Sequence, residues 1–361
     1  MQRERSGVIR VVVGEDSPLM RQIIVETLSR DPDIEVVGAG SDGREILKTV
    51  VEHKPDCVTL DLDMPVMNGL ETLRYIMSEW PTPIVILSAH TASAARLALT
   101  CLEYGAIDFV SKTNKGMRFP THELIEKVKA AASVDTAKVK FGPTDWPFSA
   151  KTKRNRSDQI ESVVLIGAST GGPQALMEIV PRLPEDLPAC VVIAQHMPPN
   201  FTRYLAERLN ERSALVVSEA EEGDLLLSER VLVTPGGMHI FLEEHLGQPA
   251  VMLLPRNDLQ RSACPSIDFA MTSFAPIFKE RLISVVLTGM GRDGTAGSIV
   301  VNRNGGTVAC QDGETSIIFG MPGSVINNGT ADIVLPLEAI ADYIVEKANE
   351  LKSRELIYER Q

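Results

Sequence analysis

The stretch VIRVVVGEDSPLMRQIIVETLSR, residues 8–30, joins a short apolar run to a helical pattern. An apolar run at 8–14 is followed by two acidic residues and then by a helical pattern at 18–30. The apolar run does not alternate with polar residues, which is typical of a strand buried on both faces, as in a parallel sheet flanked by helices. The stretch therefore predicts one strand–helix unit of an α/β fold.

The same unit recurs along the N-terminal half. Short apolar runs return at 34–38, 57–61, 83–88 and 107–110, with amphipathic stretches such as ASAARLALTCLEYG between them. Such repeats predict a (βα)₅ doubly wound domain. We expect this domain to occupy residues 1–132.

A stretch of different composition separates this half from a second α/β pattern. Residues 133–160 carry prolines, small polar residues and the charge run KTKRNR, which is typical of a solvated linker. Nucleic-acid binding by this run is the weaker alternative, because the chain as a whole is acidic. Apolar runs then return at 163–167, 190–196, 282–289 and 307–310. We expect 133–160 to be an interdomain linker and 161–352 to form a larger, doubly wound and mainly parallel α/β domain.

Composition excludes several classes of protein. The chain has 361 residues and a formal net charge of −12, which argues against non-specific binding to nucleic acid or to an anionic membrane. No apolar segment approaches the about 18 residues of a membrane span, and the N-terminus lacks the long apolar core of a secretory signal. The widely spaced cysteines predict buried, reduced thiols. We therefore expect a cytoplasmic protein with no nucleic-acid partner and no direct membrane insertion.

Polar side chains stand at the carboxyl ends of the strands expected in the first half. Glu15 and Asp16 follow the first strand, Asp61 ends the third, Ser88 ends the fourth and Lys112 follows the fifth. Each alone is explained by a helix cap or a solvated loop, but parallel strands bring their carboxyl ends to one edge. Three carboxylates there favour a hard cation such as Mg²⁺. With a lysine and a hydroxyl beside them, they predict that Asp61 forms an acyl phosphate.

This half resembles the receiver domain of two-component response regulators over about residues 8–130. The resemblance rests on GEDSP (14–18), LDLDMPVMNGLE (60–71), ILSA (86–89) and FVSK (109–112). It implies that Glu15, Asp16 and Asp61 hold Mg²⁺ and that a histidine kinase supplies the phosphoryl group to Asp61. It also implies that Ser88 and Lys112 contact that phosphoryl group.

In the second half, a glycine-rich turn between a strand and a helix holds Ser169, within GASTGGPQALMEI (167–179). Glycines allow close approach there, and the amides at the helix start can stabilise an oxyanion. The turn alone leaves three interpretations open: a catalytic nucleophile, a phosphate-binding loop and a structural turn. It departs from the dinucleotide-binding pattern and from the G-x-S-x-G elbow of α/β-hydrolases.

A histidine and an aspartate at neighbouring strand ends shift the balance toward catalysis. A serine nucleophile needs an imidazole within reach and a carboxylate that orients the imidazole. His196 closes the apolar run 190–196, directly after the helix that follows the serine. Asp293 lies in another glycine-rich turn, within VVLTGMGRDGTAG (285–297). Parallel strands would bring all three turns to one edge of the sheet.

The second half is similar to the catalytic domain of the CheB family of chemotaxis protein-glutamate methylesterases over about residues 162–345. The matching motifs are IGASTGGPQAL (166–176), AQHMPPNFT (194–202), TPGGMHI (234–240), PSIDFA (265–270), LTGMGRDGTAG (287–297) and QDGETSIIFGMP (311–322). The resemblance implies that Ser169 is the nucleophile, His196 the general base and Asp293 its orienting carboxylate. It further implies that the Met290 amide helps to form an oxyanion hole, that Thr170 supports the serine, and that this domain needs no cofactor.

The two resemblances together predict a phosphorylation-activated hydrolase. Its substrates would be glutamyl methyl esters and glutamines of chemoreceptors, and its phosphodonor a chemotaxis histidine kinase. In the family the unphosphorylated receiver packs over the catalytic face and phosphorylation loosens this docking. Two alternatives are a degenerate esterase domain that serves only as a docking module, and a nucleotide-binding domain whose turn at 167–172 holds phosphate.

Overall fold

The computed structural model describes residues 7–89, 91–112, 119–139, 141–142, 161–245, 248–256 and 263–358. Contacts divide the chain into two compact units, Met1–Thr144 and Asp145–Gln361. Most of the expected linker, residues 143–160, lies outside the described residues, so its boundaries stay a prediction. Before that gap, a short 3₁₀ helix spans Thr136–Lys138.

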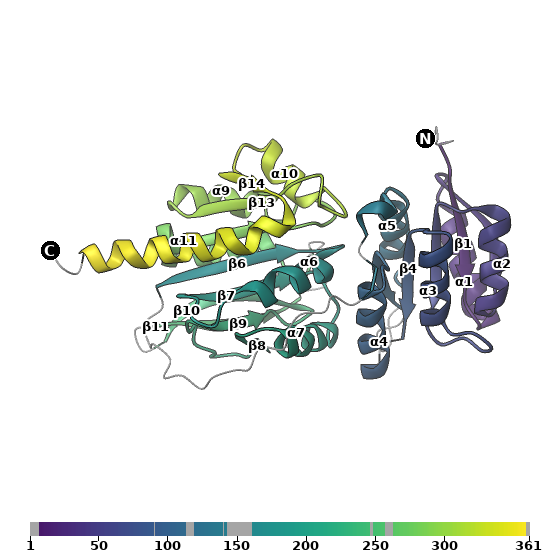
Figure 1. Cartoon of the computed structure of the whole chain (residues 1–361), viewed down its shortest axis with the longest axis horizontal. Helices are drawn as coiled ribbons and strands as arrows, with labels where there is room; N and C mark the ends of the chain where they lie inside the picture. Colours follow the sequence, from purple (N-terminus) through teal and green to yellow (C-terminus); the bar gives the residue numbers. More distant parts are fainter. Residues whose placement is uncertain are drawn as a thin grey trace. The chain divides into compact units, whose positions relative to one another are not determined.

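The N-terminal unit is a five-stranded parallel sheet flanked by helices (Figure 1). Its strand order is β2-β1-β3-β4-β5. Helix α1 packs against α5, while α2 packs against α3 and α3 against α4. The elements are β1 (Ile9–Gly14), α1 (Pro18–Ser29), β2 (Ile34–Gly40), α2 (Gly43–His53), β3 (Cys57–Asp61), α3 (Gly69–Glu79), β4 (Ile84–Ser88), α4 (Ala92–Glu103), β5 (Asp108–Ser111) and α5 (Thr121–Ala132). This confirms the predicted (βα)₅ fold.

The C-terminal unit is built on a seven-stranded sheet in which every pairing is parallel, ordered β14-β13-β12-β6-β7-β9-β8. Its strands are β6 (Ser162–Ala168), β7 (Ala189–Gln195), β8 (Val216–Glu219), β9 (Arg230–Val233), β12 (Leu282–Val286), β13 (Thr307–Gln311) and β14 (Ile333–Leu335). Strands β10 (Met238–His245) and β11 (Gln248–Pro255) form a separate antiparallel hairpin. The helices are α6 (Gly172–Ile179), α7 (Phe201–Arg212), α8 (Ile267–Phe278), α9 (Thr295–Arg303), α10 (Met321–Asn327) and α11 (Leu337–Tyr358).

The order of this sheet contains a topological switch point. Strand β6 has β7 on one side and β12 on the other, so the chain leaves β6 in one direction and later returns on its opposite side. In open α/β sheets, binding and active sites lie beyond the carboxyl ends of the strands at such a point. The expected doubly wound, mainly parallel domain is confirmed.

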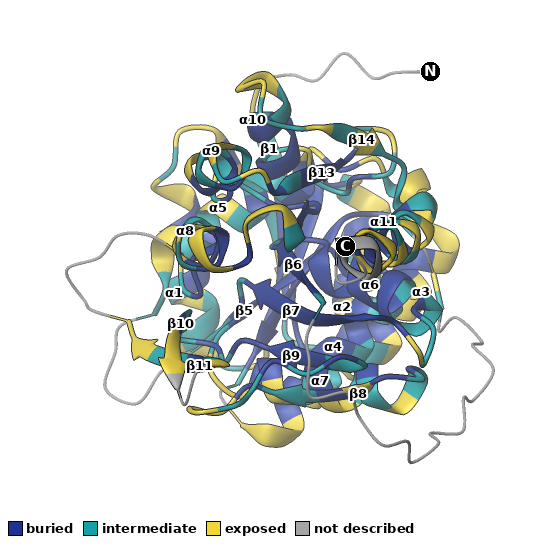
Figure 2. Cartoon of the chain, turned by 90° about the vertical axis from the view of Figure 1, so that its left-hand side faces the viewer, coloured by how far each residue is buried: buried dark blue, intermediate teal, exposed yellow. Residues whose placement is uncertain are grey.

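The core of the C-terminal unit holds the switch-point strands rigidly. Strands β6 and β7 are buried along their whole length (Figure 2). Helix α8 contributes Phe274 and Phe278 to the same core, each at most 1% exposed. Burying one such side chain stabilises a fold by about 1.5–3 kcal/mol. The turns that follow β6, β7 and β12 are therefore carried on elements with little freedom to move.

The expected buried thiols are found at four positions, Cys57, Cys101, Cys190 and Cys310, and all five cysteines are free. Cys264 is only partly buried, because it precedes α8 in a loop instead of lying in a strand or helix. Among the described residues, no helix has both the length and the apolar character needed to cross a membrane.

Candidate functional site

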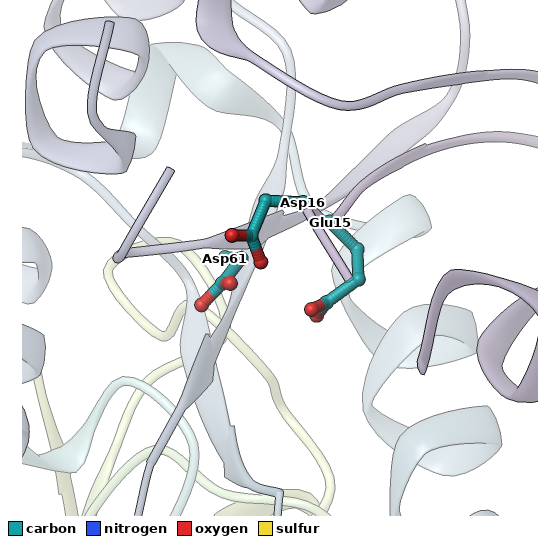
Figure 3. Close-up of side chains that lie close together, drawn as sticks. All are labelled: Glu15, Asp16 and Asp61. Atoms are coloured by element: carbon teal, nitrogen blue, oxygen red, sulfur yellow. The ribbon is translucent and has the colours of Figure 1, made fainter. Parts of the chain in front are cut away.

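Three carboxylates gather at the carboxyl edge of the N-terminal sheet. Glu15 and Asp16 directly follow β1, and Asp61 is the last residue of β3, which pairs with β1. Each offers an oxygen atom, and these three atoms lie within 4.8 Å of one another (Figure 3). Glu15 and Asp61 are buried, while Asp16 is exposed. The donor set is all oxygen and open on one side, which fits a hard divalent cation.

Lys112 lies directly beyond β5 and pairs with two of these carboxylates. Its Nζ is 2.7 Å from Glu15 Oε2 and 2.7 Å from Asp61 Oδ2. Burial raises the pKa of Glu15 and of Asp61, and the hydrogen bond and charge of Lys112 oppose the rise in both. The structure therefore brings Lys112 to the acidic cluster, as the sequence predicts.

Ser88 ends β4 and is fully buried. Its hydroxyl donates to the carbonyl oxygens of Ala94, at 3.2 Å, and of Ala89, at 3.3 Å. Its own carbonyl accepts the Lys112 amide at 2.8 Å. The backbone of Ser88 thus holds the lysine in place, while its hydroxyl bonds to backbone carbonyls near the start of α4.

In the C-terminal unit, Ser169 stands in the turn between β6 and α6. Its amide donates to the carbonyl of Thr288 at 3.1 Å, and its carbonyl accepts the Gly172 amide at 2.8 Å. A Cβ added at Gly289 would lie 2.6 Å from Ser169 Cβ, so only glycine permits the loop after β12 to pass this close. Gly171 has a φ of +78°, a region that favours glycine. The glycine-rich sequence is thus explained by a crowded turn.

His196 and Asp293 form a direct hydrogen bond. His196 Nε2 lies 2.9 Å from Asp293 Oδ2, and both side chains are largely buried. His196 follows β7, and its amide donates to the carbonyl of Ala168, the residue before Ser169, at 3.0 Å. The backbones of the expected nucleophile and base are therefore linked at the ends of adjacent strands. Among the described contacts, Ser169 Oγ makes no hydrogen bond to His196.

Asp293 is held by donors from the start of α8. Its Oδ2 accepts the amide of Ile267 at 2.8 Å, and its Oδ1 accepts the amide of Asp268 at 2.8 Å. Burial by itself raises the pKa of Asp293, but the bond and charge of His196 and these two amides outweigh it, so the pKa is lowered. Asp293 is therefore a carboxylate at neutral pH, as an orienting group for an imidazole must be.

The expected supporting residues lie beside the serine. Met290 follows Gly289, and within the described ranges no acceptor takes its amide hydrogen. Thr170 is 3% exposed, and its carbonyl accepts the Thr288 hydroxyl at 3.0 Å. The loop after β12 thus brings a backbone donor next to the Ser169 turn.

Sequence reasoning overlooked Gln195, the last residue of β7. Its side-chain amide donates to the carbonyl of Ser169 at 2.9 Å and to that of His196 at 3.3 Å, and the residue is 1% exposed. The Gln195 side-chain amide therefore links the backbone of Ser169 to the backbone of His196. The available signal was a polar residue at the end of an otherwise apolar strand.

These two units define a class: response regulators in which a receiver domain precedes an α/β domain with a serine, a histidine and an aspartate at its switch point. Residues 11–128 match the response regulator receiver domain, and residues 164–344 match CheB methylesterase. The chain belongs to the CheB methylesterase family.

Several known proteins resemble the chain closely. A protein-glutamate methylesterase/protein-glutamine glutaminase of Symbiobacterium thermophilum is 43% identical, covering 95% of this chain and 98% of that protein. A protein of the same name from Thermotoga maritima is 40% identical over 94% of this chain and 98% of its own length. The crystal structure of the Thermotoga maritima CheB methylesterase catalytic domain has a TM-score of 0.50 and 44% identity, covering 51% of this chain and 97% of that one.

Proposed function

We propose that this protein is a phosphorylation-activated protein-glutamate methylesterase and protein-glutamine deamidase that acts on chemoreceptors in the cytoplasm. The observation that carries the catalytic assignment is the hydrogen bond between His196 and Asp293, formed at the switch point beside the Ser169 turn. The family membership and the relatives' names support the reaction.

Ester hydrolysis proceeds in two steps at Ser169. The Ser169 hydroxyl attacks the ester carbonyl while His196 takes its proton, and the Met290 amide donates to the oxyanion. The carbon–methoxy bond then breaks, His196 returns the proton, and methanol leaves a glutamyl–enzyme ester. Water, activated by His196, cleaves that ester to give glutamate and free Ser169. Deamidation of a glutamine follows the same steps with ammonia as the leaving group.

The contact between His196 and Asp293 supports different tasks for the two ring nitrogens of His196. Nε2 contacts Asp293, so Nδ1 is the nitrogen that takes the serine proton. Asp293 stabilises the imidazolium while it carries that proton, and its lowered pKa keeps it ionised throughout.

The receiver half supplies control. Glu15, Asp16 and Asp61 would hold Mg²⁺, which neutralises phosphoryl oxygens when bound, and the clustering of their oxygen atoms within 4.8 Å fits this. Asp61 accepts the phosphoryl group from a chemotaxis histidine kinase. Lys112, already 2.7 Å from Asp61 Oδ2, then pairs with a phosphoryl oxygen, and Ser88 turns its hydroxyl toward the group.

Methylated chemoreceptor membranes test this function directly. Incubation with the phosphodonor-treated protein should release methanol and leave receptor peptides with glutamate in place of glutamyl ester, detected by mass spectrometry. Receptors that carry glutamine should show the one-unit mass gain of deamidation. A protein that is phosphorylated on Asp61 and binds receptors without changing either mass would instead be a docking module.

A further inference from the structure

Two helix starts in the C-terminal unit cap each other through a pair of aspartates. Asp293 precedes α9, and its carboxylate accepts the amides of Ile267 and Asp268 at the start of α8. Asp268 lies in the first turn of α8, and its Oδ1 accepts the amides of Gly294 at 2.9 Å and of Gly297 at 2.6 Å, at the start of α9. Each helix thus supplies the carboxylate that satisfies the free amides of the other.

The two helix starts are in close contact, and this contact depends on a glycine. A Cβ added at Gly297 would lie 2.6 Å from Met271 Cβ and 3.0 Å from Asp268 Cα. Gly294 has a φ of +97° and no side-chain cap of its own. The start of α9 therefore receives its capping bonds from Asp268.

The position of Asp293 follows from this arrangement. Gly294 comes directly after Asp293, and its amide bonds to both Asp268 Oδ1 and Asp293 Oδ1, at 2.9 and 3.1 Å. Asp268 therefore restrains the backbone next to Asp293 on one side and bonds to the Asp293 carboxylate through its own amide on the other. Asp293 Oδ2 also bonds to His196 Nε2, at 2.9 Å.

Building on the proposed function, we propose that Asp268 is a positioning residue for catalysis: its side chain holds residues 293–297, at the start of α9, so that Asp293 meets His196 at hydrogen-bonding distance. What matters is the place of the acceptor oxygen and not the negative charge. The pKa of Asp268 is raised, chiefly by burial and also by the nearby charge of Asp293, although the hydrogen bond from the Gly297 amide opposes the rise. A second negative charge beside Asp293 is therefore disfavoured.

A pair of substitutions separates geometry from charge. Asp268→Asn keeps the acceptor oxygen and removes the charge, whereas Asp268→Glu keeps the charge and moves the oxygen by one methylene. In full-length, phosphodonor-activated protein we expect kcat for methanol release to stay within about threefold in the Asn variant. In the Glu variant it should fall by about tenfold to a hundredfold with little change in KM, as small misplacements of catalytic groups do.

A second readout does not depend on turnover. The proton of the His196–Asp293 hydrogen bond should give a downfield NMR resonance in the wild type, which the Asn variant keeps and the Glu variant shifts or loses. Equal kcat values and unchanged resonances in both variants would overturn the proposal, as would a larger loss in the Asn variant. A wild type without activity on esters would instead contradict the proposed function.

Asp332→Ala provides a matched control for stability. The Asp332 carboxylate also accepts a backbone amide, that of Val308 at 2.7 Å, but at the amino end of the sheet, opposite the active site. This variant should lose stability without losing kcat per folded molecule. A fall in its kcat equal to that of Asp268→Glu, at equal loss of stability, would mean that Asp268 acts only through general stability.

Discussion

Among single residues, Ser169 is the proposed nucleophile, and its substitution gives the clearest test. Its turn is held by backbone bonds to Thr288 and Gly172 that do not involve its hydroxyl. Ser169→Ala should therefore leave the fold intact and lower methanol release by at least about a thousandfold. Incorporation of phosphate at Asp61 from a small phosphodonor should be unchanged in the same preparation. Full esterase activity in this variant would exclude Ser169 as the nucleophile.

The lowered pKa of Asp293 makes a prediction about acid stability. The folded-state pKa of Asp293 lies below its unfolded value, which is near the usual 3.8. Above that unfolded pKa, the ionised carboxylate therefore stabilises the fold. This contribution is lost as the pH falls through the folded-state pKa. In Asp293→Asn this part of the acid dependence should be missing. Denaturant midpoints of both proteins, measured from pH 6 to about pH 2, should therefore converge as the pH falls. A constant gap across the range would contradict the prediction.

The strand-end residues could be predicted from the sequence, whereas their partners could not. Glu15, Asp61, His196 and Asp293 follow apolar runs, and parallel pairing brings such ends to one edge. Gln195 reaches the carbonyl of Ser169, and Asp268 reaches the amide of Gly294, each 26 positions away along the chain. No local pattern encodes contacts of that kind.

At the scale of elements, the crossing of α8 and α9 depends on Gly297. An added methyl group would meet Met271 Cβ at 2.6 Å, so Gly297→Ala should force the helices apart and destabilise the C-terminal unit by about 1–3 kcal/mol. Gly313→Ala is the control, because the nearest atoms to its Cβ would be those of the Phe319 ring, at an ordinary 3.4 Å. Urea unfolding of both variants measures the difference, and equal midpoints would contradict the prediction.

The predicted strands and helices match the structure wherever a long apolar or amphipathic run marks them, as in β6, β7, α1 and α4. Strands β8 and β14 leave no clear apolar run in the sequence, because they have only four and three residues, of which one in β8 and none in β14 is buried. Helix α8 contains Pro276, and a proline in a run argues against a helix. The structure nevertheless continues α8 to Phe278.

At the scale of the whole molecule, control of the C-terminal unit by the receiver makes a prediction. A fragment that starts near residue 161 lacks the receiver and should release methanol faster than the unphosphorylated full-length chain. Both rates are measured on the same methylated receptor membranes, after circular dichroism has shown that the fragment is folded. Equal rates would mean that the receiver does not inhibit the catalytic domain.

In the proposed mechanism, phosphorylation of Asp61 switches on ester hydrolysis at Ser169. To test this switch, the rate of methanol release from methylated chemoreceptor membranes is compared between the wild type and Asp61→Asn. Each protein is measured with and without a small-molecule phosphodonor and Mg²⁺. We predict that the phosphodonor raises the rate in the wild type and has no effect in the variant. A rate that is the same under all four conditions, or no release at all from a protein phosphorylated on Asp61, would contradict the claim.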